Sequence, residues 1–257
     1  MAEDPRVAGW LEALDRRHLA DLTPSETARA LRALSSCYVE RRAKLAQGGA
    51  LDSAGKRAAF GLFYAPLHFF LTREVVRALP PAASSIRQIT DLGCGTGAAG
   101  AAWALESRAR RVSGVDRHPW AVAEANWTYK QLDLSGRAVQ GDAVRSAVRG
   151  EPGHGIMAAY TINELSEDAR AALLPQLLLA HRNGATVLIV EPIARRFAGW
   201  WPAWQRAFTE AGGRADEWRF PSALPERQRD LGRAAGLDPR ELTARTLWLQ
   251  PLVEGRQ

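Results

Sequence analysis

A glycine-rich stretch, Asp91-Leu-Gly-Cys-Gly-Thr-Gly97, constrains the fold of this chain more than any other part of the sequence. A short apolar run precedes it, and an alanine-rich run over residues 98–109 follows it. Glycine tolerates positive φ angles and lets the backbone approach a ligand closely. The pattern therefore predicts a strand, a tight turn and a helix whose first N–H groups face an anionic or electron-rich ligand group.

Two nucleotide-cofactor classes compete for this turn. Gly95, Gly97 and Gly100 also fit the dinucleotide pattern G-x-G-x-x-G, and an acid, Asp116, follows about 20 residues later, as that pattern requires. Asp91 separates the two classes, because a carboxylate at this point repels a pyrophosphate and attracts a cationic amino-acid tail. A tight turn without any ligand is the third interpretation, but it requires neither the acid nor the third glycine.

The stretch resembles the first motif, D/E-x-G-x-G-x-G, of class I S-adenosylmethionine (SAM) methyltransferases. The resemblance covers roughly residues 86–250, with further matches at Asp116 and Asp142 in the expected order. It implies an α/β, Rossmann-like fold with a seven-stranded, mostly parallel sheet, SAM as the cofactor and methyl transfer as the reaction. An NAD-dependent oxidoreductase remains the lesser alternative.

The resemblance also implies roles for individual residues. The methionine end of SAM would meet Asp91 and the loop backbone, the ribose hydroxyls would meet Asp116, and the adenine face would stack on Arg117. Asp142 and the Ala143 N–H would bind the edge of the adenine. The implied cofactor-binding residues are Asp91, Gly93, Gly95, Gly97, Asp116, Arg117, Asp142, Ala143 and Tyr160.

Two of these acids have structural alternatives. Asp116 precedes Pro119 closely enough to cap the following helix. Asp142 follows Gly141 and is an ordinary turn residue in that position. The sequence leaves both interpretations open.

From Ile86 onward, predicted strands and helices alternate, which indicates a parallel α/β sheet. The apolar, β-branched run over residues 185–190 predicts a central strand that is buried on both faces. The resemblance implies a final strand pair around a helix at residues 226–235, with the last strand inserted antiparallel. The earlier residues read as helical, so the predicted domains are an N-terminal helical cap, 1–82, and a SAM-binding methyltransferase domain, 83–257.

The cap includes an aromatic segment, residues 60–70, in which Pro66 is expected to kink or restart the helix. This segment is a candidate lid over the glycine loop. Tyr64 and His68 are its polar members, and both are candidates for facing a ligand and for general-base catalysis. Their burial in the core with a local hydrogen bond is the alternative.

The end of the fourth predicted strand carries the polar cluster Tyr160-Thr-Ile-Asn-Glu164. Open α/β sheets bind ligands beyond the carboxyl ends of their strands, so we expect this cluster to border both the cofactor and the methyl acceptor. Asn163, Glu164 and Trp200 are the predicted substrate residues, and Glu164 is a third candidate base. Alternatively, Asn163 and Glu164 only lead into the next helix, and Trp200 only packs on the sheet.

The chain carries a formal net charge of +6, from 34 Lys and Arg against 28 Asp and Glu. This balance suits RNA or another acidic partner, but solvated surface charge explains it equally well because no basic run is long. The segments Tyr-Thr-Ile-Asn-Glu-Leu and Tyr-Ala-Pro-Leu-His resemble the ribosomal small-subunit-associated methyltransferase-like family, which implies ribosomal RNA or the small ribosomal subunit as a partner. The acceptor is open between a small molecule, RNA and protein, and a non-catalytic, SAM-binding ribosome-docking protein is the alternative function.

Several other classes are disfavoured. No apolar run approaches 18 residues, so no membrane span is expected. The start, Met1-Ala-Glu-Asp-Pro5, has no secretory pattern. Cys37 and Cys94 form neither a metal spacing nor a disulfide framework, which favours the reducing cytoplasm. They also do not form the cysteine cluster that better-known members of the ribosomal family carry for an iron–sulfur centre.

Overall fold

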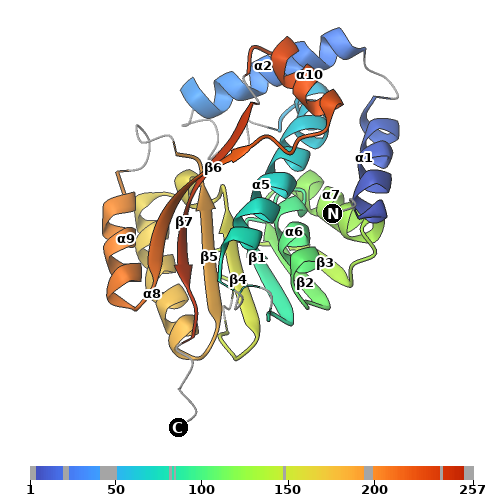
Figure 1. Cartoon of the computed structure of the whole chain (residues 1–257). Helices are drawn as coiled ribbons and strands as arrows, with labels where there is room; N and C mark the ends of the chain where they lie inside the picture. Colours follow the sequence, from blue (N-terminus) through green and yellow to red (C-terminus); the bar gives the residue numbers. More distant parts are fainter. Residues whose placement is uncertain are drawn as a thin grey trace.

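The computed structural model of this chain describes residues 4–19, 23–40, 51–80, 83, 85–146, 149–193, 199–237 and 240–251. Its strands are β1 (Gln88–Leu92), β2 (Arg111–Asp116), β3 (Gly136–Gln140), β4 (His154–Ala159), β5 (Thr186–Glu191), β6 (Arg214–Pro221) and β7 (Glu241–Leu249). They form one seven-stranded sheet in the order β3-β2-β1-β4-β5-β7-β6 (Figure 1).

The strands from β3 to β5 run parallel, whereas β7 is inserted antiparallel between β5 and β6. The order of connection reverses between β1 and β4, and ligands of open α/β sheets bind at such a reversal. The prediction of an α/β, Rossmann-like, seven-stranded and mostly parallel sheet is therefore confirmed.

Helices precede and alternate with these strands. Those before the sheet are α1 (Pro5–His18), α2 (Pro24–Glu40), α4 (Ala54–Ala59), the π-helix η1 (Phe60–Tyr64) and α5 (Ala65–Ala78). Those after β1 are α6 (Ala98–Glu106), α7 (Pro119–Gln131), the short 3₁₀ helix η3 (Ile162–Glu164), α8 (Glu167–Arg182), α9 (Trp201–Glu210) and α10 (Glu226–Ala234). The helix restart expected at Pro66 is present, because α5 begins beside it after the π-helix.

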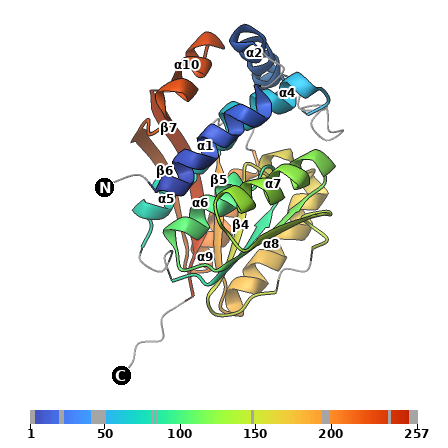
Figure 2. The ribbon, with the colours of Figure 1, turned by 90° about the vertical axis from the view of Figure 1, so that its right-hand side faces the viewer.

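The sheet lies between two helical layers, with α5, α6 and α7 on one face and α8 and α9 on the other (Figures 1 and 2). Strand β5 is buried throughout, as its sequence predicts. Leu188 and Val190 pack into the core under α5 and α6, while Val187 and Ile189 pack into the core under α8 and α9. Among the described residues, no helix combines the length and the apolar character needed to cross a bilayer.

The helices before the sheet are in close contact with it. Phe69 and Val75 of α5 are fully buried and share one core with Ile89 of β1 and Trp103 of α6. At one end of the molecule, α2 packs against α10, which comes from the C-terminal part of the chain (Figure 1). The predicted division into two domains at residue 82 stays a prediction. Helix α5, which precedes this residue, and the sheet, which follows it, share one core.

A partly buried ion pair, in which Glu124 is buried and Arg17 is 38% exposed, fastens α1 to α7. The Arg17 guanidinium donates to Glu124 Oε1 at 3.0 Å from Nε and at 2.7 Å from Nη2, and His18 Nε2 lies 3.2 Å from Glu124 Oε2. Burial favours the neutral form of Glu124, but the hydrogen bonds from His18 and Arg17 hold its pKa below the usual value. Gly61 makes room for this contact, because a Cβ there would lie 2.6 Å from His18 Nε2.

We expect Glu124→Gln to lower the free energy of unfolding by about 2 kcal/mol, because it leaves the Arg17 contact without its charged acceptor. Urea denaturation followed by circular dichroism measures the change. The matched control is Glu12→Gln, at an α1 side chain that is 74% exposed, which should change stability by less than about 0.5 kcal/mol. Equal losses for both variants would contradict the role of this ion pair.

Candidate functional site

The glycine loop joins β1 to α6 as the sequence predicts. Gly93, Gly95 and Gly97 have φ angles of +71°, +52° and +75°, in the left-handed region that glycine adopts without strain. The Gly93 N–H donates to the Val115 carbonyl at 2.8 Å, and the Gly97 N–H donates to the Cys94 carbonyl at 2.8 Å. Gly97 caps α6, so the loop backbone leads directly to the N–H groups of the first helical turn.

Close contacts hold the loop on two sides. A Cβ at Gly93 would lie 2.5 Å from the Thr161 side chain, whose Oγ1 donates to the Gly93 carbonyl at 3.2 Å. A Cβ at Gly97 would lie 2.8 Å from the Tyr129 ring on α7. The loop is therefore clamped between the turn after β4 and α7, and both positions require glycine for space as well as for φ.

Asp91, the last acid before the loop, is almost completely buried. Its Oδ2 accepts the Gly100 N–H at 3.1 Å, while its Oδ1 is buried with no hydrogen-bond partner among the described residues. Burial raises the pKa of Asp91 to about 7; the charge of Asp116 adds to the rise, and the hydrogen bond from Gly100 partly offsets it. The site thus holds a carboxyl group that gains from any cationic partner.

Gly100 belongs to the same contact. A Cβ at this position would lie 2.6 Å from Asp91 Oδ2, so the carboxylate fills the space beside the helix. Gly100 is the third glycine of the apparent dinucleotide pattern. The Asp91 side chain explains why this position requires glycine. A pyrophosphate at this turn would meet that carboxylate, which disfavours the dinucleotide interpretation.

Asp116 lies at the end of β2 and binds the glycine loop. Its Oδ2 accepts the Gly95 N–H at 2.9 Å, and its Oδ1 accepts the His118 N–H at 2.8 Å. The cap of α7 is His118, whose Nδ1 accepts the Trp120 N–H at 3.2 Å. The alternative of Asp116 as the helix cap is therefore wrong, and its role toward a ribose remains a prediction.

The residues predicted to surround the adenine lie at the ends of β2 and β3. Asp142 Oδ1 accepts the Val144 N–H at 2.8 Å, which is the turn role that the sequence left open. Ala143 is buried beside it, whereas Arg117 is exposed. The Gly141 N–H donates to the Asp116 carbonyl at 3.0 Å and brings the two strand ends together. Adenine binding by these residues stays a prediction.

An aromatic wall, defined as Phe60 and Tyr64 of η1, His68 of α5 and Tyr160 after β4, lies beside the loop. A Cβ built at Gly95 would lie 4.0 Å from the Phe60 ring. The His68 and Tyr160 rings are stacked, with centroids 3.8 Å apart and an angle of 11° between their planes. The Tyr64 ring lies 5.9 Å from that of His68, so the structure brings both predicted cap residues to the end of β4.

Tyr160 adopts a strained backbone conformation, with a φ angle of +58° that side chains other than glycine rarely adopt. Its N–H donates to the Val190 carbonyl at 2.8 Å, and its hydroxyl is buried without a partner among the described residues. Burial raises the pKa of Tyr160 and lowers the pKa of His68 to about 3. The stacked rings are therefore both uncharged at neutral pH.

Asn163 links two neighbouring elements instead of lying free at the strand end. Its backbone N–H donates to Glu191 Oε1 at 3.1 Å, and its Nδ2 donates to Glu191 Oε2 at 2.6 Å. Its Oδ1 accepts the Trp200 indole N–H at 2.9 Å. Two predicted substrate residues, Asn163 and Trp200, are thus in contact, while Glu164 is exposed one residue further on.

Glu191, at the end of β5, is a polar residue of this region that is not among the predicted site residues. It is fully buried, and burial raises its pKa to about 8; the Asn163 N–H and the Arg245 charge oppose that rise. Arg245 pairs with Glu191 across β5 and β7, and its guanidinium lies 4.0 Å from the Trp201 ring centre. No local signal marks Arg245, because its place depends on the antiparallel insertion of β7.

Cys94 lies in the loop as a buried free thiol, and burial raises its pKa well above the usual value. Within the described ranges, no group of three His, Cys, Asp or Glu residues is arranged to hold a metal ion. Cys37 lies in α2, and its side chain is outside the described part of the structure.

Comparisons with known proteins agree with this fold. Residues 89–184 match a family model described as a methyltransferase domain. The fold is similar to that of the mitomycin 7-O-methyltransferase MmcR, with a TM-score of 0.52 and 14% identity over 96% of this chain and 73% of that chain. A comparison with curated protein sequences finds no match.

Two further solved structures have lower TM-scores. The YcgJ protein from Bacillus subtilis has a TM-score of 0.47 and 13% identity, over 70% of this chain and 97% of that chain. The methyltransferase domain of bacterial CtHen1-CN has a TM-score of 0.48 and 16% identity, over 71% of this chain and 99% of that chain. The match of residues 89–184 to the methyltransferase-domain model, together with the similarity of the fold to that of MmcR, supports a methyltransferase of the class I superfamily.

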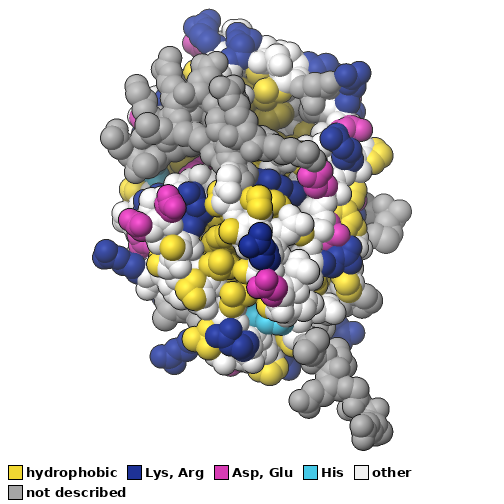
Figure 3. All heavy atoms as spheres, turned by 90° about the vertical axis from the view of Figure 1, so that its left-hand side faces the viewer, with side chains coloured by type: hydrophobic (Ala, Val, Ile, Leu, Met, Phe, Trp, Pro, Cys, Tyr) yellow, Lys and Arg dark blue, Asp and Glu magenta, His cyan; other side chains and the backbone are white. Residues whose placement is uncertain are grey.

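None of these comparisons supports the more specific resemblance to the ribosomal small-subunit-associated family, or the NAD-dependent and non-catalytic alternatives. Figure 3 shows the face of the molecule on the side of α9 and β6, where basic and acidic side chains are interspersed with apolar ones. Among the side chains that the figure colours on that face, the positive charge does not gather into a single patch. A ribosomal partner therefore stays an untested prediction.

We expect Asp91→Asn to change how stability depends on pH. In the folded wild type the pKa of Asp91 is raised from 3.8 to about 7. The contribution of this carboxyl group to the free energy of unfolding is therefore complete below pH 3.8 and is lost as the pH rises through 7. Between pH 5 and pH 8 the wild type should therefore lose about 2.5 kcal/mol more unfolding free energy than the variant. Urea titrations of both proteins at the two pH values measure this difference, and parallel losses would contradict the raised pKa.

Proposed function

We propose that this protein is a SAM-dependent methyltransferase that binds its cofactor on the glycine loop and its methyl acceptor beside the turn after β4. The Asp91 carboxylate is the observation that carries the proposal. Its Oδ1 is buried and has no partner among the described residues, beside a loop whose backbone permits close ligand approach. An unpaired buried carboxylate is costly, and the ammonium group at the methionine end of SAM has the charge that offsets this cost.

The other groups of the site suit the remaining parts of the cofactor. Each Asp116 oxygen already accepts one backbone N–H, and a carboxylate oxygen has a second lone pair for a ribose hydroxyl. Asp142 and Ala143 lie at the neighbouring strand end, where an adenine edge would be bound. SAM supplies a methyl group on a cationic sulfur, so the chief tasks of the protein are positioning and exclusion of water.

The aromatic wall bears on the choice of base. A group with a pKa near 3 removes protons poorly at neutral pH, so His68 suits orientation of Tyr160 and of an acceptor better than proton transfer. Burial also raises the pKa of Tyr64, against the effect of its hydrogen bond with Ser35. Glu164, which is exposed, remains the candidate base for an acceptor that must lose a proton. The acceptor itself is unassigned.

Calorimetric titration of the purified protein with SAM, S-adenosylhomocysteine and NAD, in parallel, tests the proposal. We expect saturable binding of the first two with dissociation constants in roughly the micromolar range, and no heat with NAD. Binding of NAD alone would contradict the assignment of Asp91 and favour the dinucleotide pattern. Absence of binding to all three would contradict the cofactor site.

We expect Asp116→Ala to weaken SAM binding at least about tenfold, or 1.4 kcal/mol, because it removes the proposed ribose acceptor and the anchor of the Gly95 N–H. The matched control is Asp168→Ala, at an exposed position on α8, which should leave the affinity within about twofold. The same titration measures both variants. Unchanged affinity in the Asp116 variant would show that the ribose site is misplaced.

A further inference from the structure

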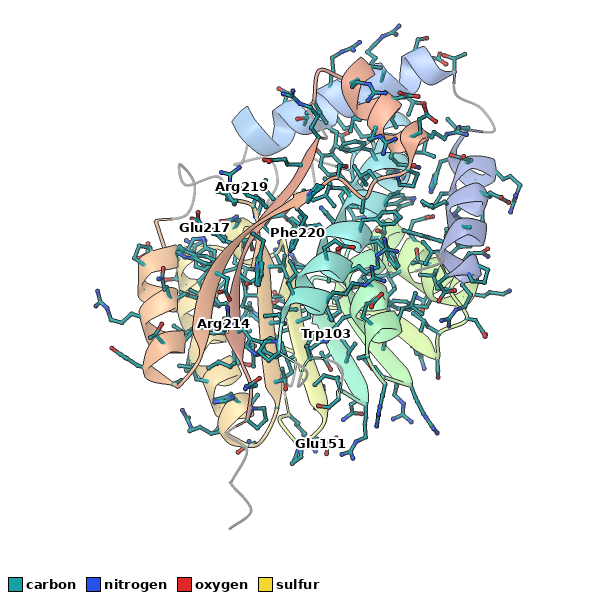
Figure 4. All side chains as sticks on the ribbon, in the orientation of Figure 1. Trp103, Glu151, Arg214, Glu217, Arg219 and Phe220 are labelled. Atoms are coloured by element: carbon teal, nitrogen blue, oxygen red, sulfur yellow. The ribbon has the colours of Figure 1, made fainter. Side chains whose placement is uncertain are left out.

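A second polar site lies at the opposite end of the sheet from the glycine loop. A hollow of about 520 Å³ opens at the amino ends of β1 and β2, and its lining residues are Arg87, Gln88, Arg110, Arg111, Ser135, Glu151, Pro152 and Gly153. Glu151 marks this place at the lower end of the sheet in Figure 4, away from the end covered by α2 and α10. None of the residues of the proposed methyl-transfer site contributes to it.

Arg87, one of the lining residues, is held in place by the turn before β4. Its Nη2 donates to the Pro152 carbonyl at 2.8 Å, and its backbone N–H donates to the Gly153 carbonyl at 2.8 Å. Gly153 has a φ of +80°, and a Cβ there would lie 2.8 Å from Arg87 Nε. A glycine at this turn therefore lets the guanidinium lie across the backbone. The Pro152 carbonyl accepts one N–H of the Arg87 guanidinium, so the side chain is oriented before any ligand arrives.

Two more arginines lie beside it. The Arg110 N–H donates to the Arg87 carbonyl at 2.9 Å, and Arg111 pairs with Gln88 in the parallel register of β1 and β2. The salt bridges of the described residues include none of these three arginines. Glu151 is the acid of the lining, and its carboxylate accepts a hydrogen bond from the Gln88 amide.

We propose that this hollow binds the phosphate groups of a small polyanion, with Arg87, Arg110 and Arg111 as the phosphate-binding residues. Guanidinium groups present paired N–H donors that match phosphate oxygens, and like charges held close together create a positive potential that attracts anions. The lining contains three arginines and one carboxylate, so it keeps an excess of positive charge. A hollow of this size suits a chain of two or three phosphates, whereas an RNA strand needs an extended basic face.

Isothermal calorimetry with inorganic tripolyphosphate at 0.1 M salt tests the proposal. We expect saturable binding with one site per chain, and Arg110→Ala/Arg111→Ala should weaken it at least about tenfold. Both positions are exposed, so the double variant is expected to fold. Arg206→Ala, at an exposed arginine on α9 that removes one positive charge away from the hollow, is the control and should stay within about twofold.

Gly153→Ala tests the orientation of Arg87 independently, because the added Cβ displaces the guanidinium without removing its charge. We expect this variant also to bind tripolyphosphate at least about fivefold more weakly. Its thermal melting curve shows whether it is folded. SAM affinity should be unchanged in the double variant, which separates this site from the proposed methyl-transfer site.

Parallel titrations with ATP and with a single-stranded RNA oligonucleotide distinguish the source of the phosphates. Equal affinity for ATP and tripolyphosphate supports recognition of the phosphate chain alone, and tighter binding of ATP supports a nucleotide. The proposal is overturned if tripolyphosphate shows no saturable binding, or if Arg206→Ala weakens binding as much as the double variant does. Tighter RNA binding that tripolyphosphate does not displace would also overturn it.

Discussion

The hydrogen bond from the Gly100 N–H to the Asp91 carboxylate is the contact on which the candidate cofactor site depends. It fixes a carboxyl side chain between the end of β1 and the first turn of α6, where no Cβ fits at residue 100. Burial then raises the pKa of Asp91 to about 7, so the group changes its charge close to neutral pH. Burial of this group lowers the stability of the free protein at neutral pH, and a cationic ligand group beside it would offset that loss.

The remaining contacts of the site hold the strand ends around this carboxylate. Asp116 binds the Gly95 N–H and so fixes the loop to the end of β2. Thr161 binds the Gly93 carbonyl and fixes the loop to the turn after β4. Asn163 continues this chain of contacts to Glu191 on β5. The rigid part of the site thus consists of four strand ends joined by side chains, and the aromatic wall lies beside it.

Sequence reasoning reached the fold because its signals are local. The alternation of strands and helices, the buried run of β5 and the glycine loop each depend on neighbouring residues, and the structure confirms them. Contacts between distant segments left no such signal. Arg245 meets Glu191 only because β7 is inserted antiparallel, and Glu124 meets Arg17 only because α1 lies along α7. The sequence identified Asp116 as a candidate acceptor, but it did not show that one carboxylate oxygen accepts the Gly95 N–H of the loop and the other accepts the His118 N–H.

The most direct test of the account is a count of the protons released when S-adenosylhomocysteine binds at pH 6, from binding heats in two buffers of different ionisation enthalpy. At this pH the Asp91 carboxyl of the free protein is mostly protonated, because its pKa is raised to about 7. A ligand ammonium beside it favours the charged form, so the proton is released on binding. We predict release of most of one proton per site by the wild type and none by Asp91→Asn. Binding to the wild type without proton release would contradict the central claim that Asp91 receives the cationic end of the cofactor.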